Sequence, residues 1–299
     1  MQKDSLPEVS LAGLWLFLRR KGAFMVTASQ HTPIVLTIAG SDSGGGAGIQ
    51  ADIKAISATG SYACSVITAL TAQNTQGVTG ILGIDPDFVK AQLDAVFSDL
   101  NVVAVKIGML ADANIIGAVA EKLREYQPQY IVLDPVMVAT SGDLLLESSA
   151  IDALKTQLLP LATVITPNLP EGAALLGCDV PQSQQDMEAL IDALRALDTP
   201  AILLKGGHLE SEQNSNDLLI TNSDVQFFNT TRIATNNTHG TGCTLSSAIA
   251  SFLAKGNELD EAVKLGKEYI TQAIAHADEL KIGKGHGPVH HFYALNKDA

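Results

Sequence analysis

The stretch Asn237-Thr238-His239-Gly240-Thr241-Gly242-Cys243-Thr244 runs directly into an apolar helical segment over residues 245–253. Two glycines just before a helix let the backbone approach a ligand closely, and the N–H groups of a first helical turn have no partner within the helix. These free donors and the positive end of the helix dipole together favour phosphate binding. The stretch therefore predicts an anion hole at the start of a helix.

Cys243 falls in the first turn of this expected helix. The positive field there is expected to lower the pKa of its thiol below the reference value of about 8.5. An acid–base group beside a phosphate cradle indicates phosphoryl transfer. The alternative is that Gly-Thr-Gly forms only a tight turn and that Cys243 is a small buried residue, because free cysteine is usually inert packing.

Composition limits the class of protein. The 299 residues are 46% hydrophobic and 17% charged, which is enough apolar sequence for one large core. A net charge of −13 argues against a nucleic-acid partner, which would require a basic face. The three cysteines lack C-x-x-C spacing, so they indicate neither a disulfide framework nor zinc and favour a reducing cytoplasm.

The N-terminus differs from the remainder of the chain. An apolar run from Leu11 to Leu18 precedes Arg19, Arg20 and Lys21. This run is shorter than the ~20 residues that span a bilayer, and its charges follow it, whereas a secretory signal has them in front. We expect residues 1–32 to be a dispensable extension, with Met25 a possible start, rather than a helix lying on a membrane surface.

From residue 33 onward, short β-branched runs alternate with helical patterns. Strands are expected at Ile34–Ala39, Ser65–Leu70, Val102–Ile107, Tyr130–Leu133, Thr163–Thr166 and Ala201–Leu204, with an antiparallel hairpin at Leu218–Thr221 and Val225–Phe228. Helices are expected at Ala47–Ala58, Pro86–Leu100, Ala113–Glu125, Ser149–Leu158, Gln185–Ala196, Cys243–Lys255 and Leu259–Leu280. This alternation predicts an α/β fold whose mostly parallel sheet has helices on both faces and a small antiparallel edge.

Such sheets bind ligands beyond the carboxyl ends of their strands. A glycine-rich segment, residues 40–48, follows the first expected strand and opens the first helix. It matches neither a Walker A loop nor G-x-G-x-x-G. Its glycines would allow close approach to a small molecule, and Asp42 or Asp52 could accept hydrogen bonds from it. A βα turn needed only for packing is the alternative.

Other expected strands also end in polar or slot-forming residues. The Gln73 amide suits the donor–acceptor edge of an aminopyrimidine, although a polar loop would explain it equally well. Asn168 and Glu171 lie one helical turn apart and could hold Mg²⁺ directly or through water, or could simply cap a helix. Lys205 could meet phosphates. Met109 and Val136 could wall a flat slot, although apolar residues at strand ends usually belong to the core.

Eight motifs occur together in one order. They are TIAGSDSGGGAGIQAD (37–52), TALTAQNTQGV (68–78), KIGML (106–110), VLDPVM (132–137), SGD (141–143), ITPNLPE (165–171), LLKGGH (203–208) and NTHGTGCTLSSAIA (237–250). This set resembles the hydroxymethylpyrimidine/phosphomethylpyrimidine kinases of thiamine biosynthesis, within the ribokinase-like superfamily. The resemblance covers residue 33 to about residue 292 and implies a single three-layer kinase domain over 33–299, after the extension.

The resemblance also implies an activity and its residues. ATP would phosphorylate the alcohol 4-amino-5-hydroxymethyl-2-methylpyrimidine and then its monophosphate. Gly240, Thr241 and Gly242 would form the anion hole, Lys205 would contact ATP phosphates, and Cys243 stands where many superfamily members carry a catalytic Asp. Asn168 and Glu171 would organise Mg²⁺. The ring would meet the substrate-binding residues Gln73, Gly40, Asp52, Met109 and Val136. The expected partners are the pyrimidine and ATP, without nucleic acid or membrane, in a cytoplasmic homodimer.

Three other functions are compatible with parts of the sequence. A pyridoxal kinase of the same superfamily is the nearest, and Gln73 argues against it. A non-catalytic binding module would lack Lys205, Glu171 or the Gly-Thr-Gly loop, all of which are present. A dinucleotide oxidoreductase would carry a fingerprint that is absent. The cluster His286, His290 and His291 has no nearby Cys or carboxylate, and we assign no metal to it.

Overall fold

A computed structural model describes residues 31–137, 148–209 and 214–295. The chain divides into two compact units, Met1–Thr32 and Pro33–Ala299, and the second contains all the elements named below. The run Leu11–Leu18 and Met25 lie outside the described residues, so the dispensable extension stays a prediction. The SGD motif at 141–143 also lies outside them.

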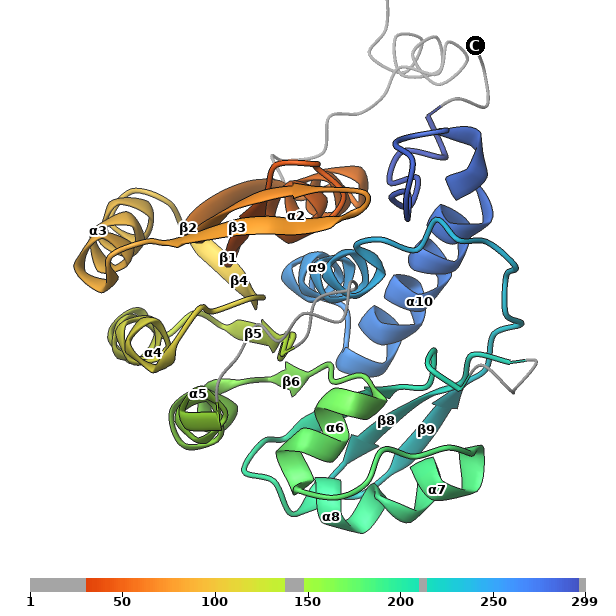
Figure 1. Cartoon of the computed structure of the whole chain (residues 1–299). Coiled ribbons are helices and arrows are strands. Elements are labelled where there is room, and N and C mark those ends of the chain that lie inside the picture. The colour runs from red at the N-terminus through yellow and green to blue at the C-terminus, as the bar shows by residue number, and fades with distance from the viewer. Residues whose placement is uncertain (1–30, 138–147, 210–213, 296–299) are drawn as a thin grey trace, which may run out of the picture. The chain divides into compact units, whose positions relative to one another are not determined.

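Within the described part of the second unit, nine strands form one sheet in the order β3-β2-β1-β4-β5-β6-β7-β8-β9 (Figure 1). Their bounds are β1 Ile34–Asp42, β2 Tyr62–Asn74, β3 Gly77–Gly83, β4 Val102–Ile107, β5 Tyr130–Leu133, β6 Val164–Ile165, β7 Ala201–Lys205, β8 Asp217–Thr221 and β9 Val225–Phe228. The neighbours from β2 across to β7 in this order pair in parallel, and β8 and β9 form the expected antiparallel edge. The predicted α/β class and mostly parallel sheet are confirmed.

The opposite edge of the sheet differs from the prediction. Residues 71–77, expected as a loop, belong mostly to β2, and a turn at Thr75 and Gln76 leads into β3, which pairs antiparallel with β2. Strand β3 contains Gly77, Gly80 and Gly83, and most of its residues are exposed. It therefore lacks the alternation of buried and exposed side chains that identifies a strand in a sequence.

Helices occupy the connections between strands (Figure 1). Their bounds are α2 Gly48–Ala58, α3 Pro86–Phe97, α4 Ala113–Tyr126, α5 Ser148–Ala153, α6 Leu169–Leu176, α7 Gln184–Ala189, α8 Ile191–Arg195, α9 Thr241–Ala254 and α10 Leu259–Ala275, with a π-helical turn at Leu154–Leu158 and 3₁₀ turns at Leu159–Leu161 and Ala277–Glu279. The helix expected at 185–196 is interrupted at Leu190, and the one expected at 259–280 stops at Ala275. The remaining expected helices are present with small shifts at their ends.

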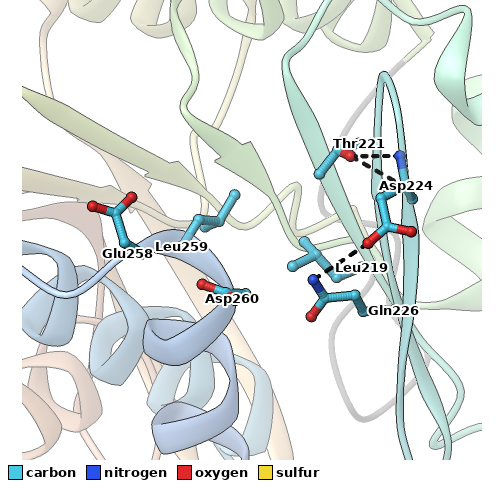
Figure 2. Close-up of a pocket in the computed structure, with 7 residues that line it drawn as sticks. All are labelled: Leu219, Thr221, Asp224, Gln226, Glu258, Leu259 and Asp260. Atoms are coloured by element: carbon cyan, nitrogen blue, oxygen red, sulfur yellow. Dashed lines mark hydrogen bonds between the residues drawn. The ribbon is translucent and has the colours of Figure 1, made fainter.

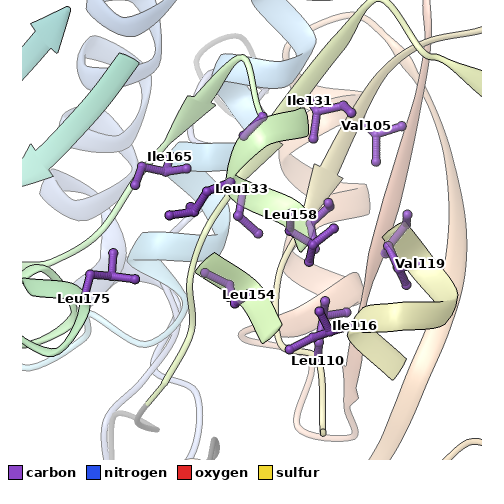
Figure 3. Close-up of a cluster of buried hydrophobic side chains, with 14 of the residues drawn as sticks. Val105, Leu110, Ile116, Val119, Ile131, Leu133, Leu154, Leu158, Ile165 and Leu175 are labelled. Carbon is purple, nitrogen blue, oxygen red and sulfur yellow. The ribbon is translucent and has the colours of Figure 1, made fainter. Parts of the chain in front are cut away.

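The sheet has an apolar core on each face because its central strands are buried on both sides. On β5, Ile131 and Leu133 join the cluster that covers α3, α4 and α5, whereas Val132 joins the cluster beneath α2, α9 and α10. Figure 3 shows part of the first cluster, with Leu133 beside Leu154 and Leu158. Truncating one such side chain to alanine costs about 2–5 kcal/mol. The two cores make the sheet a rigid base for the loops at its edge.

Helix starts in this fold use two different devices. Asp85 and Asp112 cap α3 and α4 with their side chains, which accept from first-turn N–H groups. Helix α9 instead begins at Gly240, which has a left-handed φ of 80° and makes no side-chain cap. Its first turn is therefore open to an anion, as the sequence predicts.

Candidate active site

The loops that follow the strands meet at the carboxyl edge of the sheet. The chain passes from β1 to β2 in one direction along the sheet and from β4 to β7 in the other, so the order reverses between β1 and β4. Ligands of open α/β sheets bind at such a reversal. The sequence-predicted residues cluster at the ends of β1, β2, β4, β5, β6 and β7 and at the start of α9.

The first turn of α9 is the candidate anion-binding element. Among the described residues, none accepts a hydrogen bond from the backbone N–H of Gly242 or Cys243. A Cβ at Gly242 would lie 3.4 Å from Lys205 Nζ and 3.4 Å from Asp134 Oδ2, so this face of the turn is open toward both groups. The geometry places two free N–H donors next to an ammonium group, which is suited to a phosphate.

Gly240 joins this turn to the glycine-rich loop between β1 and α2. A Cβ at Gly240 would lie only 1.8 Å from the carbonyl oxygen of Gly46, so only glycine permits the two backbones to approach this closely. Gly46 is itself constrained, because a Cβ there would lie 2.3 Å from His239 Cδ2. The two loops therefore fit together as one surface.

Lys205 at the end of β7 pairs with Asp134, which follows β5. Lys205 Nζ lies 2.8 Å from Asp134 Oδ1, and Thr166 Oγ1 donates to the same oxygen at 2.9 Å. Burial opposes the charge on Lys205, but the carboxylates of Asp134 and Glu171 outweigh it and raise the pKa of Lys205. The ammonium group is held charged and in place. Sequence reasoning assigned no role to Asp134.

Cys243 corrects one prediction. Desolvation by the surrounding groups raises the pKa of its thiol to about 11, although Lys106 and the Gly48 N–H act in the opposite direction. The predicted lowering of this pKa is therefore wrong, and the thiol is neutral at pH 7. The Gly48 N–H is the first of α2, so the sulfur lies at the starts of two helices, α2 and α9. That convergence could not be read from the local sequence.

Asp52 is surrounded by hydrogen-bonding side chains of the protein itself. Its side chain is fully buried on α2, and both carboxylate oxygens lie 2.9 Å from Lys106 Nζ. Thr37 Oγ1 and Ser247 Oγ donate to the same carboxylate at 2.6 and 2.8 Å. These protein partners hold the carboxylate beside Lys106, and the predicted contact of Asp52 with a substrate stays a prediction. Burial opposes the charge of Lys106, but Asp52 outweighs it and raises the Lys106 pKa.

Asn168 and Glu171 form a capping box at the start of α6. Asn168 Oδ1 accepts from the Glu171 N–H at 2.8 Å, and Glu171 Oε2 accepts from the Asn168 N–H at 2.7 Å. Both hydrogen bonds of a capping box are therefore present, as the alternative prediction of a helix cap required. Burial raises the pKa of Glu171 to about 7, with Lys205 opposing and the charge of Asp134 adding to the rise. A divalent cation near Glu171 and Asp134 would relieve this carboxylate repulsion.

The predicted ring slot is partly assembled. Gly40 and Met109 touch, because a Cβ at Gly40 would lie 2.6 Å from Met109 Cε. Val136 is half-buried and lies three residues after the end of β5. Gln73 is half-buried near the end of β2, and its side chain lies 3.4 Å from His239 Nε2. The residue that sequence reasoning missed here is His239, whose only signal was its place next to Gly240.

In the segment with clustered histidines, the rings of His286 and His291 have different partners. His286 Nδ1 lies 3.1 Å from the Asn236 carbonyl, and His291 Nε2 lies 2.9 Å from Thr244 Oγ1. The backbone N–H of His286 donates to the Thr75 carbonyl at 2.9 Å. The segment thus connects the β2–β3 turn with the loop that precedes α9.

A cavity of about 220 Å³ lies away from this cluster. Leu219, Thr221, Asp224, Gln226 and residues 258–260 line it, as Figure 2 shows. Thr221 pairs with Ala201 at the start of β7, whereas Lys205 marks the carboxyl end of that strand. The cavity therefore lies at the opposite end of the strands from the phosphate-binding groups and is not the candidate active site.

Comparison with known proteins is consistent with this geometry. A family model described as phosphomethylpyrimidine kinase matches residues 42–290. A relative from Escherichia coli (strain K12), named hydroxymethylpyrimidine/phosphomethylpyrimidine kinase, is 53% identical over 259 residues, which cover 87% of this chain and 97% of that protein.

Two solved structures share the fold. The crystal structure of phosphomethylpyrimidine kinase from Clostridium difficile 630 is 45% identical, with a TM-score of 0.72, and the match covers 81% of this chain and all of that one. A Bacillus subtilis pyridoxal kinase in complex with ADP is 36% identical, with a TM-score of 0.82, and the match covers 89% of this chain and all of that one. No helix within the described residues combines the length and apolarity needed to cross a membrane.

Proposed function

Because this chain belongs to the phosphomethylpyrimidine kinase family, we propose that its site phosphorylates 4-amino-5-hydroxymethyl-2-methylpyrimidine and then the resulting monophosphate, using ATP. The chain is thus a kinase, and the reaction belongs to thiamine biosynthesis. One observation carries the proposal: the first turn of α9, with its free N–H groups, lies next to the Lys205 ammonium at the sheet edge that also holds Gln73, Gly40 and Met109.

Phosphoryl transfer from ATP requires alignment of the reacting groups and neutralisation of phosphate charge more than it requires a strong base. The N–H groups of Gly242 and Cys243 would bind a phosphoryl oxygen, together with Thr241 and Gly240 as the predicted anion hole. Lys205 would hold a second oxygen while Asp134 keeps its ammonium oriented. Such preorganised donors stabilise charge that develops in the transition state.

Mg²⁺ would fit beside Glu171 and Asp134. Within the described residues, no three or more His, Cys, Asp or Glu side chains are grouped so that they could hold a metal ion by themselves. Mg²⁺ in kinases does not require such a group, because it commonly binds one or two carboxylates together with substrate phosphates and water. Bound there, it would neutralise phosphate charge. Asn168 would contribute by holding one oxygen of Glu171 in the capping box.

The pH dependence of Mg²⁺ use tests this assignment. Glu171 has a pKa of about 7, and Mg²⁺ binds the ionised form, so a fall in pH through 7 should weaken apparent Mg²⁺ binding. We expect the Mg²⁺ concentration for half-maximal rate to be several-fold higher at pH 6 than at pH 8. Glu171→Gln keeps the capping box but cannot ionise. It is the control because ATP itself also takes up a proton in this pH range, which weakens Mg²⁺ binding in both proteins. If this variant showed the same pH dependence as the parent, Glu171 would not be the group involved.

The ring contact is tested by Gln73→Met. The substitution removes hydrogen-bonding groups in a slot walled by Met109 and Gly40, so pyrimidine affinity should fall by about 1–3 kcal/mol. ATP affinity should barely change, because ATP phosphates would bind at α9. Isothermal titration calorimetry with the pyrimidine and with ATP measures the two affinities. Unaltered pyrimidine affinity would make Gln73 a strand residue without a ligand.

The role of Cys243 is tested by separating the two phosphorylations. Only the first acceptor is an alcohol that must lose a proton, and a positioned acid–base group contributes about 10²–10⁴-fold in such a step. Serine has nearly the same shape, but its hydroxyl loses a proton far less readily than a thiol does. If Cys243 exchanges a proton with the alcohol, Cys243→Ser should therefore slow the first step at least about tenfold more than the second. Single-turnover rates with the alcohol and with its monophosphate give the ratio. Equal losses would indicate a structural or anion-binding role.

The overall function is tested by a coupled ATP-consumption assay. Two ATP should be consumed per pyrimidine alcohol, with the monophosphate as an intermediate. Pyridoxal provides the competing substrate, since a pyridoxal kinase shares this fold. A thermal-shift comparison of the two ligands gives an independent readout. Turnover of pyridoxal alone would overturn the pyrimidine assignment.

We also propose a cytoplasmic homodimer. Within the part of the chain that the structure describes, strand β3 has no neighbour on its outer side. It carries no charged residue and exposes Ile81 and Leu82. Edge strands that remain solvated usually carry charge or proline, so this edge is suited to a second copy. Sedimentation equilibrium should give twice the mass of the 31.4 kDa chain.

A further inference from the structure

His239 lies between the glycine-rich loop and Gln73. Its side chain is largely buried, its Nε2 lies 2.9 Å from Asp42 Oδ2, and the same nitrogen lies 3.4 Å from the Gln73 amide. The His239 backbone N–H donates to the Gly287 carbonyl at 3.1 Å, which fixes the main chain there. The ring therefore has little freedom to move away from either side chain.

Asp42 determines where the hydrogen lies between it and His239. Besides contacting His239, its carboxylate accepts from the N–H groups of Gly44, Gly46 and Ala47 at 2.7, 3.0 and 2.8 Å. Burial opposes ionisation, but the bonds from His239 and from these backbone groups lower the pKa of Asp42. An ionised carboxylate only accepts hydrogen bonds. The shared hydrogen therefore belongs to His239 Nε2, which acts as a donor.

Thr71 fixes the other side of the Gln73 amide. Its hydroxyl has a single hydrogen, and the Ser41 carbonyl accepts at 2.8 Å from Thr71 Oγ1. The Gln73 amide lies 3.1 Å from the same hydroxyl oxygen. Thr71 can therefore act toward Gln73 only as an acceptor.

These two neighbours require opposite halves of the amide. In the structure, the Gln73 oxygen lies beside Thr71 and the Gln73 nitrogen lies beside His239. At His239, the amide N–H₂ and the ring N–H are then two donors facing each other. The oxygen and nitrogen of an amide have nearly the same shape, and a half-turn exchanges them. After that turn, the amide nitrogen donates to Thr71. The amide oxygen then lies 3.4 Å from His239 Nε2, on the side of the hydrogen that this nitrogen donates mainly to Asp42, and the clash between two donors is removed.

We infer that His239 is a positioning residue that fixes the orientation of the Gln73 amide and thereby selects a 4-aminopyrimidine over its 4-oxo analogue. The inference rests on the proposed function. In this orientation, one N–H and one oxygen lone pair of the Gln73 amide remain available to a ligand, and their order along the amide is fixed. A 4-aminopyrimidine offers a ring-nitrogen acceptor beside an amino donor, which complements that order. A 4-oxo analogue offers a ring N–H beside a carbonyl and would require the amide to turn.

The test compares the two ring types in the whole protein. Affinities for the 4-amino alcohol and for its 4-oxo analogue are measured by calorimetry for the parent, His239→Phe and His239→Gln. The parent should favour the amino compound by about 10–100-fold, since a mismatched site leaves buried polar groups unpaired. His239→Phe keeps a ring against Gly46 but loses the donor, so the preference should fall below about threefold. His239→Gln restores an N–H donor and should recover part of the preference.

Thr71→Val is the second route to the same answer, and it applies if His239→Phe does not fold. It removes the acceptor on the other side of the amide, leaves His239 intact and should also reduce the preference. In a Gln73→Met background, His239→Phe should change the preference no further, because contacting residues are non-additive. An unchanged preference in both His239→Phe and Thr71→Val, even with lower melting temperature or kcat, would overturn the inference. Failure of the parent to phosphorylate the amino alcohol would be a separate result, against the proposed function.

Discussion

Replacing Lys205 with methionine should lower kcat by about 10²–10³-fold, the loss typical of removing one preorganised donor to developing charge. The same change leaves Asp134 buried without its nearest cation. Breaking a buried ion pair from one side costs about 3–5 kcal/mol, so the melting temperature should also fall. Steady-state kinetics and thermal unfolding measure the two effects separately.

A double variant separates stability from chemistry. Lys205→Met with Asp134→Asn removes the orphaned charge, so much of the lost stability should return while kcat stays low. Recovery of kcat together with stability would show that Lys205 acts only through the fold, and its proposed contact with ATP phosphates would be wrong. Retained kcat in the single variant would lead to the same conclusion.

Gly240→Ala should be the most damaging small substitution in the anion-binding turn. Alanine would be strained at the left-handed φ of 80°, and its Cβ would lie 1.8 Å from the Gly46 carbonyl oxygen. The backbone strain costs about 1–2 kcal/mol, and overpacking adds about 1–3 kcal/mol. Separating the two loops would also misplace the N–H groups of Gly242 and Cys243, so kcat should fall by ~10²-fold or more.

Gly256→Ala is the matched control, because Gly256 has a similar φ of 87° but no atom within 4 Å of the position that a Cβ would take. It carries the backbone strain without the clash. We expect Gly256→Ala to lose about 1–2 kcal/mol of stability and to keep its activity. Equal losses of stability and activity in both variants would show that contact between the Gly240 and Gly46 loops is unimportant.

Local pattern determined the architecture and the edge at which the site lies. Strands β4, β5 and β9 have the predicted bounds, because runs such as Val102–Ile107 are apolar throughout most of their length and are followed by turn-forming or polar residues. The order of strands and helices then brings the residues that follow each strand to one edge. For this reason the sequence by itself was enough to place Lys205, Glu171 and the Gly240 turn at the same edge of the sheet.

Strand β3 and the state of the groups at that edge depended on tertiary contacts. The Cys243 thiol has a raised pKa because burial in the folded chain desolvates it. This effect outweighs the field of the local helix, from which the opposite shift was predicted. Asp52 serves Lys106 because strand pairing and the packing of α2 bring together two residues 54 positions apart. Local sequence reports helix starts and strand ends, but it does not report desolvation.

The same division holds for the ring slot. The sequence by itself supplied Gln73 as an amide of suitable chemistry, and the ordered motifs supplied the kinase family. The order of the oxygen and nitrogen of that amide depends on the tertiary structure, because His239 lies 166 positions away and meets Gln73 only through the fold. The physical reason is that the direction of each hydrogen bond to Gln73 depends on what else its partner contacts: Asp42 behind His239, and the Ser41 carbonyl behind Thr71. Only the fold brings these groups together.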